Sequence, residues 1–323
     1  MFINLLENPE LIRGAARMVA EEDGIHLFRM TEELQKFYSY SDVAELRASC
    51  TSGVRVVFET DSPLLTMGVR FGRCAREYFY VDIMIDNMEC LRFGPEDNQD
   101  EYIFSTELPE GEKRVEIYLS HCSEAIITGL EVAEDANVSP CEEFDRKIMF
   151  IGDSITQGMT AFSGSRTYAS LVSAALEVEF HNVAVGGAIM QGKVGELALA
   201  LEWDDAVVAF GVNDYNGCLK LEDVAAEATL MLENLSKRKG AKIYLLTPIS
   251  IARESDINRD GVSLQQFRDA IAEAAAPFKN VKVIDGAALV PPEAGLFFDG
   301  LHPNEDGMAV YAENLYSQML VVQ

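Results

Sequence analysis

The second half of the chain alternates short apolar runs with longer stretches in which apolar residues recur at helical spacing. The short runs are rich in Val, Ile, Leu and Phe and have the length of strands: residues 147–153, 180–185, 206–210, 242–247 and 281–285. The helical patterns lie between and after them, at residues 168–176, 194–201, 221–238, 264–275 and 306–320. Apolar strands that alternate with helices predict a parallel five-stranded sheet covered on both faces, which is a three-layer α/β/α domain.

The first half of the chain has a different pattern. Residues 10–22 place apolar side chains at helical spacing and end in Glu-Glu-Asp-Gly, which predicts a short helix. Short β-rich segments separated by turn residues follow, at residues 53–60, 65–71, 78–85, 114–120 and 126–132. Their spacing predicts a β-sandwich or jelly roll. A polar, proline-containing connector at 136–143 divides the chain into an N-terminal β-sandwich domain, residues 1–143, and a C-terminal α/β domain, residues 144–323.

The composition restricts the classes of partner. The 323 residues include 53 acidic and 26 basic side chains, a formal net charge of -27, which favours solubility and disfavours binding to nucleic acid or to anionic membranes. No apolar run approaches the roughly 18 residues of a membrane-spanning helix. Residues 1–9 lack the pattern of a signal peptide, so we expect a cytoplasmic protein. The six cysteines and four histidines lack metal-ligand spacing, and we expect reduced thiols, no metal and no cofactor.

Residues able to perform acyl chemistry follow the ends of the predicted strands. Ser154, Gly187 and Asn213 come after the first three strands, and Asp299 and His302 come after the last. Because the carboxyl ends of parallel strands share one edge of a sheet, we expect these residues to meet. A serine nucleophile needs a base, commonly a histidine oriented by a carboxylate, and Asp299 can reach His302 through a local turn. The backbone N–H groups of Ser154 and Gly187, with the Asn213 amide, would supply donors to an oxyanion.

Three other interpretations compete with this one. Asp153 or Ser154 could serve only as the cap of a following helix, which is a common role for both residue types. Residues 187–194 fit the GxxxxGK pattern of a phosphate-binding loop, but Val194 lacks the hydroxyl that would bind Mg²⁺. The G-x-S-x-G turn of the α/β-hydrolases fails because Thr156 stands where its last glycine belongs.

The strand-end segments resemble the SGNH hydrolases, also called the GDSL esterase/lipase superfamily. The matching blocks are Gly-Asp-Ser at 152–154, Gly187, Gly-Val-Asn-Asp at 211–214 and Asp-Gly-Leu-His-Pro at 299–303. The resemblance covers residues 147–323 and implies a flavodoxin-like hydrolase domain. It also implies that Ser154 attacks an acyl carbonyl, that His302 acts as general base and then acid, and that Asp299 orients His302. Ala188 is a departure, because many relatives carry a polar residue after the glycine of the second block.

Superfamily members with a β-sandwich ahead of the hydrolase domain include carbohydrate esterases that remove acetyl groups, and also acyltransferases and esterases of natural-product pathways. The resemblance therefore implies a serine esterase that hydrolyses short-chain acetyl esters of carbohydrates through an acyl-enzyme. The alternatives are a non-catalytic carbohydrate-binding or scaffold protein, and an acyltransferase or lysophospholipase-type esterase. The expected partner is a small-molecule or oligosaccharide ester, with homo-oligomerisation left open. Arg253 is a candidate donor to substrate hydroxyls or a surface side chain, and Asp153 and Asp214 are expected to be loop scaffolds.

Overall fold

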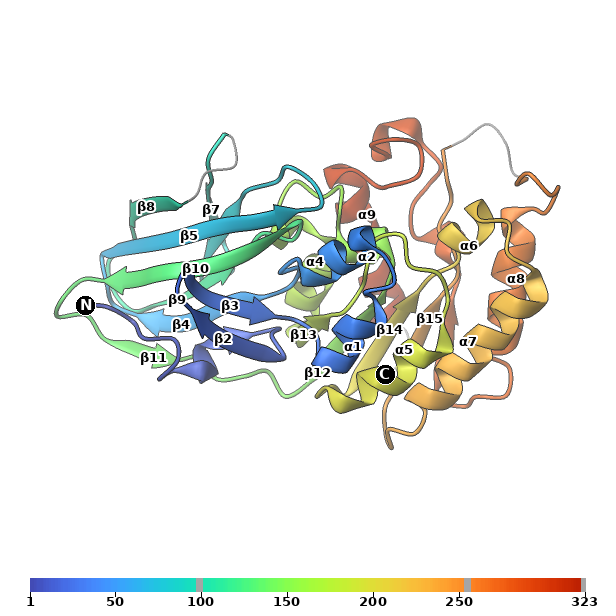
Figure 1. Cartoon of the computed structure of the whole chain (residues 1–323), viewed down its shortest axis with the longest axis horizontal. Coiled ribbons are helices and arrows are strands. Elements are labelled where there is room, and N and C mark those ends of the chain that lie inside the picture. Colours follow the sequence, from blue (N-terminus) through green and yellow to red (C-terminus); the bar gives the residue numbers. More distant parts are fainter. Residues whose placement is uncertain (97–100, 253–256, 321–323) are drawn as a thin grey trace.

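The computed structural model describes residues 1–96, 101–252 and 257–320. The first half of the chain forms two antiparallel sheets, and the second half forms one parallel sheet flanked by helices (Figure 1). Within the described residues, no helix is long and apolar enough to span a membrane. All six cysteines are free thiols, as the sequence predicts.

Both antiparallel sheets contribute to a shared apolar core. The first has the order β1 (Ile12–Arg13), β4 (Arg55–Thr60), β9 (Lys113–Tyr118), β6 (Val81–Ile85) and β7 (Glu89–Phe93), with β11 (Val138–Pro140) also paired to β4. The second has the order β2 (Arg17–Glu21), β3 (Gly24–Phe28), β10 (Ser123–Val132), β5 (Leu64–Cys74) and β8 (Tyr102–Glu107). The core side chains alternate along strands of both sheets, for example Val56, Ile83, Met67 and Ile127.

The predicted helix over residues 10–22 is wrong. The structure instead has a short 3₁₀ turn, Pro9–Leu11, followed by β1 and by β2, which pairs with β3 from Arg17↔Phe28 to Glu21↔Gly24. The Glu-Glu-Asp-Gly segment is therefore the turn of a hairpin. Pairing with β3 and packing against the N-terminal core outweigh the helical spacing of the apolar residues, because tertiary contacts routinely override local propensity.

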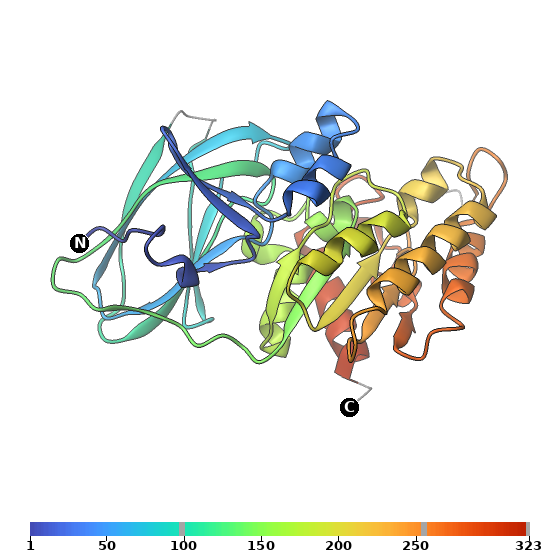
Figure 2. The same ribbon diagram turned by 60° about the horizontal axis from the view of Figure 1, so that its bottom comes forward.

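Two short helices of the first half lie against the C-terminal domain and were not foreseen from the sequence. They are α1 (Glu32–Phe37), capped by the Thr31 hydroxyl, and α2 (Asp42–Ser49), capped by the Ser41 hydroxyl. Figures 1 and 2 both show them beside the half that contains the parallel sheet. Their apolar side chains, with Met30, join the core of that half: Leu34, Tyr38 and Ala48.

The prediction of a parallel five-stranded sheet is confirmed. Its order is β13 (Glu179–Asn182), β12 (Lys147–Gly152), β14 (Asp205–Ala209), β15 (Ile243–Leu246) and β16 (Val281–Ile284), with every pair parallel. One face packs against α4 (Tyr168–Leu176) and α9 (Glu305–Leu320). The other packs against α5 (Gly192–Leu197), α7 (Leu221–Leu235) and α8 (Leu264–Ala274). The carboxyl ends of the strands therefore open toward one edge, where the candidate residues lie.

Buried charges join the two halves of the molecule. The Arg55 guanidinium lies 2.6 Å from a Glu116 oxygen in the N-terminal sheet and 2.9 Å from a Glu179 oxygen in β13. Arg29, also buried, donates to four carbonyl oxygens, among them that of Asn182, the last residue of β13, and that of Ala184 just after it. Because an unpaired buried charge costs several kcal/mol, about 3–5 by typical measurements, these contacts hold the halves in a defined orientation.

Candidate active site

Ser154 begins a four-residue helix, α3 (Ser154–Gln157), directly after β12. Asp153 is the cap of this helix, because its carboxylate accepts a hydrogen bond from the Ile155 N–H at 3.0 Å. The capping interpretation is thus correct for Asp153 and leaves the Ser154 hydroxyl available for another partner. Gly152 is required at the strand end, since a Cβ there would lie 2.6 Å from the Ala209 carbonyl oxygen.

The Ser154 hydroxyl, His302 and Asp299 form a continuous chain of hydrogen bonds. Ser154 Oγ lies 2.9 Å from His302 Nε2, and His302 Nδ1 lies 2.8 Å from Asp299 Oδ2. The other Asp299 oxygen accepts from the backbone N–H groups of Leu301 at 3.0 Å and His302 at 2.9 Å. With Nδ1 donating to the carboxylate, Nε2 presents its lone pair to the serine hydroxyl, which is the arrangement that a general base requires.

The Asp299 carboxyl is held in its ionised form. Burial by itself would raise its pKa, but hydrogen bonds from the His302 backbone and ring, together with the ring charge, lower the pKa below its ordinary value. The side chain of Asp299 is 41% exposed and that of His302 is 15% exposed. An ionised carboxylate at this position fixes the ring tautomer and stabilises the imidazolium that forms when the serine loses its proton.

The loops after the second and third strands lie side by side and carry the other candidate donors. Gly187 is exposed and has a φ of +81°, a conformation that favours glycine. Asn213, on α6 (Val212–Asn216), donates one amide hydrogen to the Ala188 carbonyl oxygen at 2.9 Å. Its second N–H is then available for an oxyanion. The Ala188 side chain is buried in the core. Although Ala188 lacks the polar side chain that many relatives carry at this position, its backbone carbonyl oxygen accepts the hydrogen bond that orients Asn213.

Two further side chains, those of Asp214 and Gln157, hold these loops in place. A scaffold role in the loops is the one expected for Asp214. Asp214 accepts from the Met190 N–H at 3.1 Å and so ties α6 to the second-strand loop. Gln157, which the sequence analysis did not single out, accepts from the Gly186 N–H at 2.7 Å and donates to the Arg47 carbonyl oxygen at 3.0 Å. Gln157 is the last residue of α3, and its contacts with Gly186 and Arg47 join distant parts of the chain, so no local sequence signal identifies it.

Asp153 and Asp214 are buried carboxyl groups that resist ionisation. Burial, with a smaller contribution from the Asp214 charge, raises the pKa of Asp153 to about 7. Burial likewise raises the pKa of Asp214 to about 6. A cavity of about 10 Å³ beside Asp153, lined also by Ile155 and Tyr311, has room for about one water molecule. Each of the two carboxyl groups accepts a hydrogen bond from a backbone N–H group, that of Ile155 for Asp153 and that of Met190 for Asp214.

The raised pKa of Asp153 predicts a pH-dependent stability difference in Asp153→Asn. The folded protein keeps a proton on Asp153 up to about pH 7, whereas the unfolded chain releases it near pH 4. Stability of the natural protein should therefore fall as pH rises between these values, by about 1.4 kcal/mol per pH unit relative to the variant. Urea unfolding of both proteins at pH 5, 6 and 7 measures this difference, since the other titrating groups are common to both. Parallel stability profiles would contradict the assignment.

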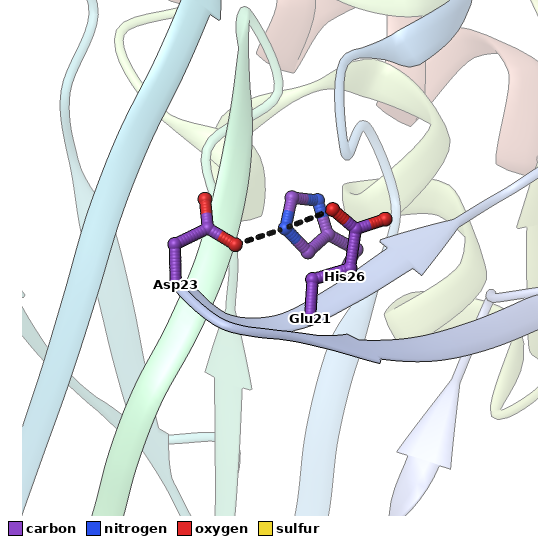
Figure 3. A group of neighbouring side chains, drawn as sticks. All are labelled: Glu21, Asp23 and His26. Carbon is purple, nitrogen blue, oxygen red and sulfur yellow. Dashed lines mark hydrogen bonds and ion pairs between the residues drawn. The ribbon is translucent and has the colours of Figure 1, made fainter.

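A separate group of ligating side chains lies on the β2–β3 hairpin (Figure 3). Asp23 Oδ1 is 2.8 Å from His26 Nε2, and Glu21 Oε2 is 3.8 Å from the same nitrogen. Figure 3 shows both carboxylates directed at this one ring nitrogen. The hydrogen bond from His26 lowers the pKa of Asp23. These contacts make Glu21, Asp23 and His26 a compact polar cluster on the β2–β3 hairpin of the N-terminal half.

Arg253, the candidate donor to substrate hydroxyls, lies outside the described residues. The remaining predicted site residues are brought to one edge of the parallel sheet, with hydrogen bonds that join Ser154 to His302 and His302 to Asp299. Asn213 and Gly187 belong to adjoining loops, connected through the Asn213 bond to Ala188.

Comparison with known proteins identifies the family of the second half of the chain. The model of the GDSL-like lipase/acylhydrolase family matches residues 150–310, a range that includes Ser154 and His302. The C-terminal domain therefore belongs to this family, and the chain is a carboxylic ester hydrolase of the SGNH superfamily. No curated protein sequence matches the chain closely enough to count as a relative.

Several solved structures share the fold over nearly the whole chain. A salicylyl-acyltransferase from a tetracycline biosynthetic pathway has a TM-score of 0.86 at 21% identity, with 96% of this chain and 94% of that chain covered. A structure described as a GDSL-like lipase from Bacteroides ovatus has a TM-score of 0.79 at 19% identity, covering 100% and 98%. A family two carbohydrate esterase from Clostridium thermocellum, in complex with cellohexaose, has a TM-score of 0.66 at 14% identity, covering 95% and 98%. At such identities the likeness concerns the fold alone.

Proposed function

We propose that the chain is a serine esterase in which Ser154, His302 and Asp299 form the catalytic triad. The observation that carries this proposal is the unbroken hydrogen-bond chain from the Ser154 hydroxyl through the His302 ring to the Asp299 carboxylate. His302 takes the serine proton as Oγ bonds to the acyl carbon, and it then gives that proton to the departing alcohol. Water attacks the resulting acyl-enzyme by the same route and regenerates the serine.

The oxyanion of each tetrahedral intermediate is stabilised by the backbone N–H groups of Ser154 and Gly187 and by the Asn213 amide. Support comes from the position of these groups. Ser154 is at the first turn of α3, where backbone N–H groups lack partners within the helix, and Gly187 exposes its backbone to solvent. The bond from Asn213 to Ala188 fixes the amide before substrate arrives, and fixed donors stabilise developing charge most effectively.

The substrate that we propose is a short-chain ester, in particular an acetyl ester of a carbohydrate. The overall fold shared with carbohydrate esterases supports this class. A cavity beneath the nucleophile turn, beside Asp153 and Ile155, measures about 10 Å³, which is too small for an acyl chain. Screening purified protein on acetylated oligosaccharides, with release of acetate as the readout, tests the proposal. Absence of Ser154-dependent acetate release from every acetylated sugar would contradict the carbohydrate part of it.

Turnover should depend steeply on acyl length. We expect kcat/KM to fall from acetyl to butyryl to octanoyl 4-nitrophenyl esters, because each methylene that a small pocket cannot accommodate costs on the order of 1 kcal/mol. Initial rates under subsaturating substrate give the ratio directly. Equal or faster turnover of the octanoyl ester would contradict a short-chain esterase and favour a lipid or long-chain acyl substrate.

Acyl transfer is a second candidate outcome of the same acyl-enzyme, and the fold likeness to an acyltransferase supports testing it. Hydrolysis and transfer differ only in whether water or another hydroxyl attacks the acyl carbon. Adding an alcohol or sugar acceptor to the esterase assay and measuring the fraction of new ester separates the two. A predominantly hydrolytic enzyme yields free acid even with excess acceptor, whereas a transferase diverts most of the acyl group.

A further inference from the structure

An arginine from the N-terminal half contacts the loop that follows β13 and contains Gly186 and Gly187, called the glycine loop below. Arg47 lies in the last turn of α2, and its Nη1 donates to the Gly186 carbonyl oxygen at 2.9 Å. The same nitrogen lies 2.8 Å from the position that a Cβ on Gly187 would occupy. The Arg47 backbone is itself fixed, because its carbonyl oxygen accepts from Arg29 and from Gln157. A positive charge therefore stands next to the loop whose N–H is a candidate oxyanion donor.

A second arginine, Arg76, lies near the segment that carries Asp299 and His302. The guanidinium carbon of Arg76 is 5.7 Å from the centre of the Phe298 ring, and Phe298 directly precedes Asp299. Arg47 thus contacts the loop that contains Gly186, and Arg76 contacts the ring that precedes Asp299. The pKa of Arg47 is lowered first by burial and then by the positive charge of Arg76.

Neither arginine has a counter-ion among the described residues, although acids outnumber bases 53 to 26 in this chain. No described carboxylate lies within ion-pair distance of Arg47 or Arg76, and the buried Arg76 Nε has no hydrogen-bond partner there. The nearby Arg73 offers a contrast, since it lies 2.7 Å from a Glu124 oxygen and 3.7 Å from a Glu45 oxygen. Two like charges without a carboxylate partner repel each other, and a bound anion would relieve that repulsion.

We propose that Arg47 and Arg76 form an anion-binding site at the active-site entrance, so that the preferred ester carries a negatively charged group on its acyl or its alcohol part. This inference rests on the proposed esterase function. Guanidinium groups recognise carboxylate and phosphate oxygens through paired, charge-assisted hydrogen bonds. The N-terminal half then takes part in substrate selection, while the triad and the oxyanion donors belong wholly to the C-terminal half.

Matched pairs of esters test the proposal. For the alcohol side we would compare 3-acetoxybenzoate with uncharged 3-acetoxybenzamide, and for the acyl side phenyl hydrogen succinate with phenyl succinamate. We expect kcat/KM for the anionic member of at least one pair to exceed that of its amide by about tenfold or more, which is the effect of one charged hydrogen bond. The pair that shows the preference identifies the side of the ester that carries the charge. Added salt should reduce the preference.

Variants of the arginines test whether the preference for anionic esters depends on Arg47 and Arg76. Arg76→Gln should bring the ratio close to one, because it removes one of the two charges that would hold the anion. Arg47→Gln should also lower the ratio, and Arg47→Lys should retain part of it. Arg73→Gln removes an exposed arginine three residues from Arg76 and should leave the ratio unchanged. Equal kcat/KM within both pairs, or a preference that survives Arg76→Gln, would overturn the proposal.

A different set of results would contradict the esterase proposal itself. In that case hydrolysis of all four esters would be absent, or it would persist in Ser154→Ala. Binding then tests the anion site by itself: titration calorimetry with Ser154→Ala should show tighter binding of the anionic member of a pair, and this difference should disappear when Arg76→Gln is added. Equal binding of both members in that titration would overturn the anion site regardless of turnover.

Discussion

Alanine at Ser154 or at His302 should lower kcat for a short-chain aryl ester by roughly 10⁴-fold or more. The two groups act as one unit, because the serine is nucleophilic only while His302 Nε2, 2.9 Å away, can accept its proton. Once one partner is removed, the other has no further role. The double variant should therefore be only slightly slower than either single variant. Steady-state rates of the four proteins give the comparison.

Two controls make the result specific to the triad. Asp299→Asn should cost about 10⁴-fold, because an amide cannot hold the His302 ring in the tautomer that presents a lone pair to serine. Thermal unfolding of each variant should show a folded protein at the assay temperature, so that the loss of rate reports on catalysis. Losses that multiply in the double variant would mean that Ser154 and His302 act independently, contrary to the proposed mechanism.

Asn213→Ala should lower kcat by about 10²–10³-fold, equivalent to about 2.7–4 kcal/mol, with little change in KM. The amide is already oriented by its bond to the Ala188 carbonyl oxygen, so its free N–H can stabilise charge that develops only in the transition state. Loss of that hydrogen bond affects the barrier and not the ground-state complex. Full Michaelis profiles of the variant and the natural protein on an acetyl ester separate the two effects.

A matched control is available elsewhere in the domain. Asn314 also donates its amide hydrogen to a backbone carbonyl, that of Leu289 at 3.0 Å, but it lies on α9 and does not touch the glycine loop. Asn314→Ala should leave kcat close to normal. A large rise in KM with normal kcat in Asn213→Ala would place Asn213 in ground-state binding and remove it from the oxyanion site.

The sequence by itself determined the C-terminal architecture and the candidate residues on its loops. A parallel strand buried on both faces must be apolar along its length, so runs such as that of β12 are visible without any tertiary information. The pairing of Asp299 with His302 is equally local, because residues three positions apart meet within one turn. Both features, the buried parallel strands and the Asp299–His302 pair, can be predicted from residues that are close together in the sequence.

Helical spacing in residues 10–22 shows where such local information ends. The same apolar residues can serve the face of a helix or the inner side of strands, and pairing of Arg17 with Phe28 decides between the two. The two strands hold this register because Met18 of β2 and Leu27 of β3 pack in the core that they share with β10 and β5. No pattern within the segment contains this information.

Only the tertiary structure brought Arg47 to the Gly186 carbonyl oxygen and Arg76 to the ring of Phe298. Arg47 is 139 residues from its partner Gly186, and neither residue has a neighbour in the sequence that reveals the contact. The contact exists because α1 and α2 bury Leu34 and Ala48 in the core of the other half, which brings the end of α2 to the glycine loop. Contacts of this kind follow from packing between distant segments, and packing depends on the whole surface of both halves rather than on local sequence.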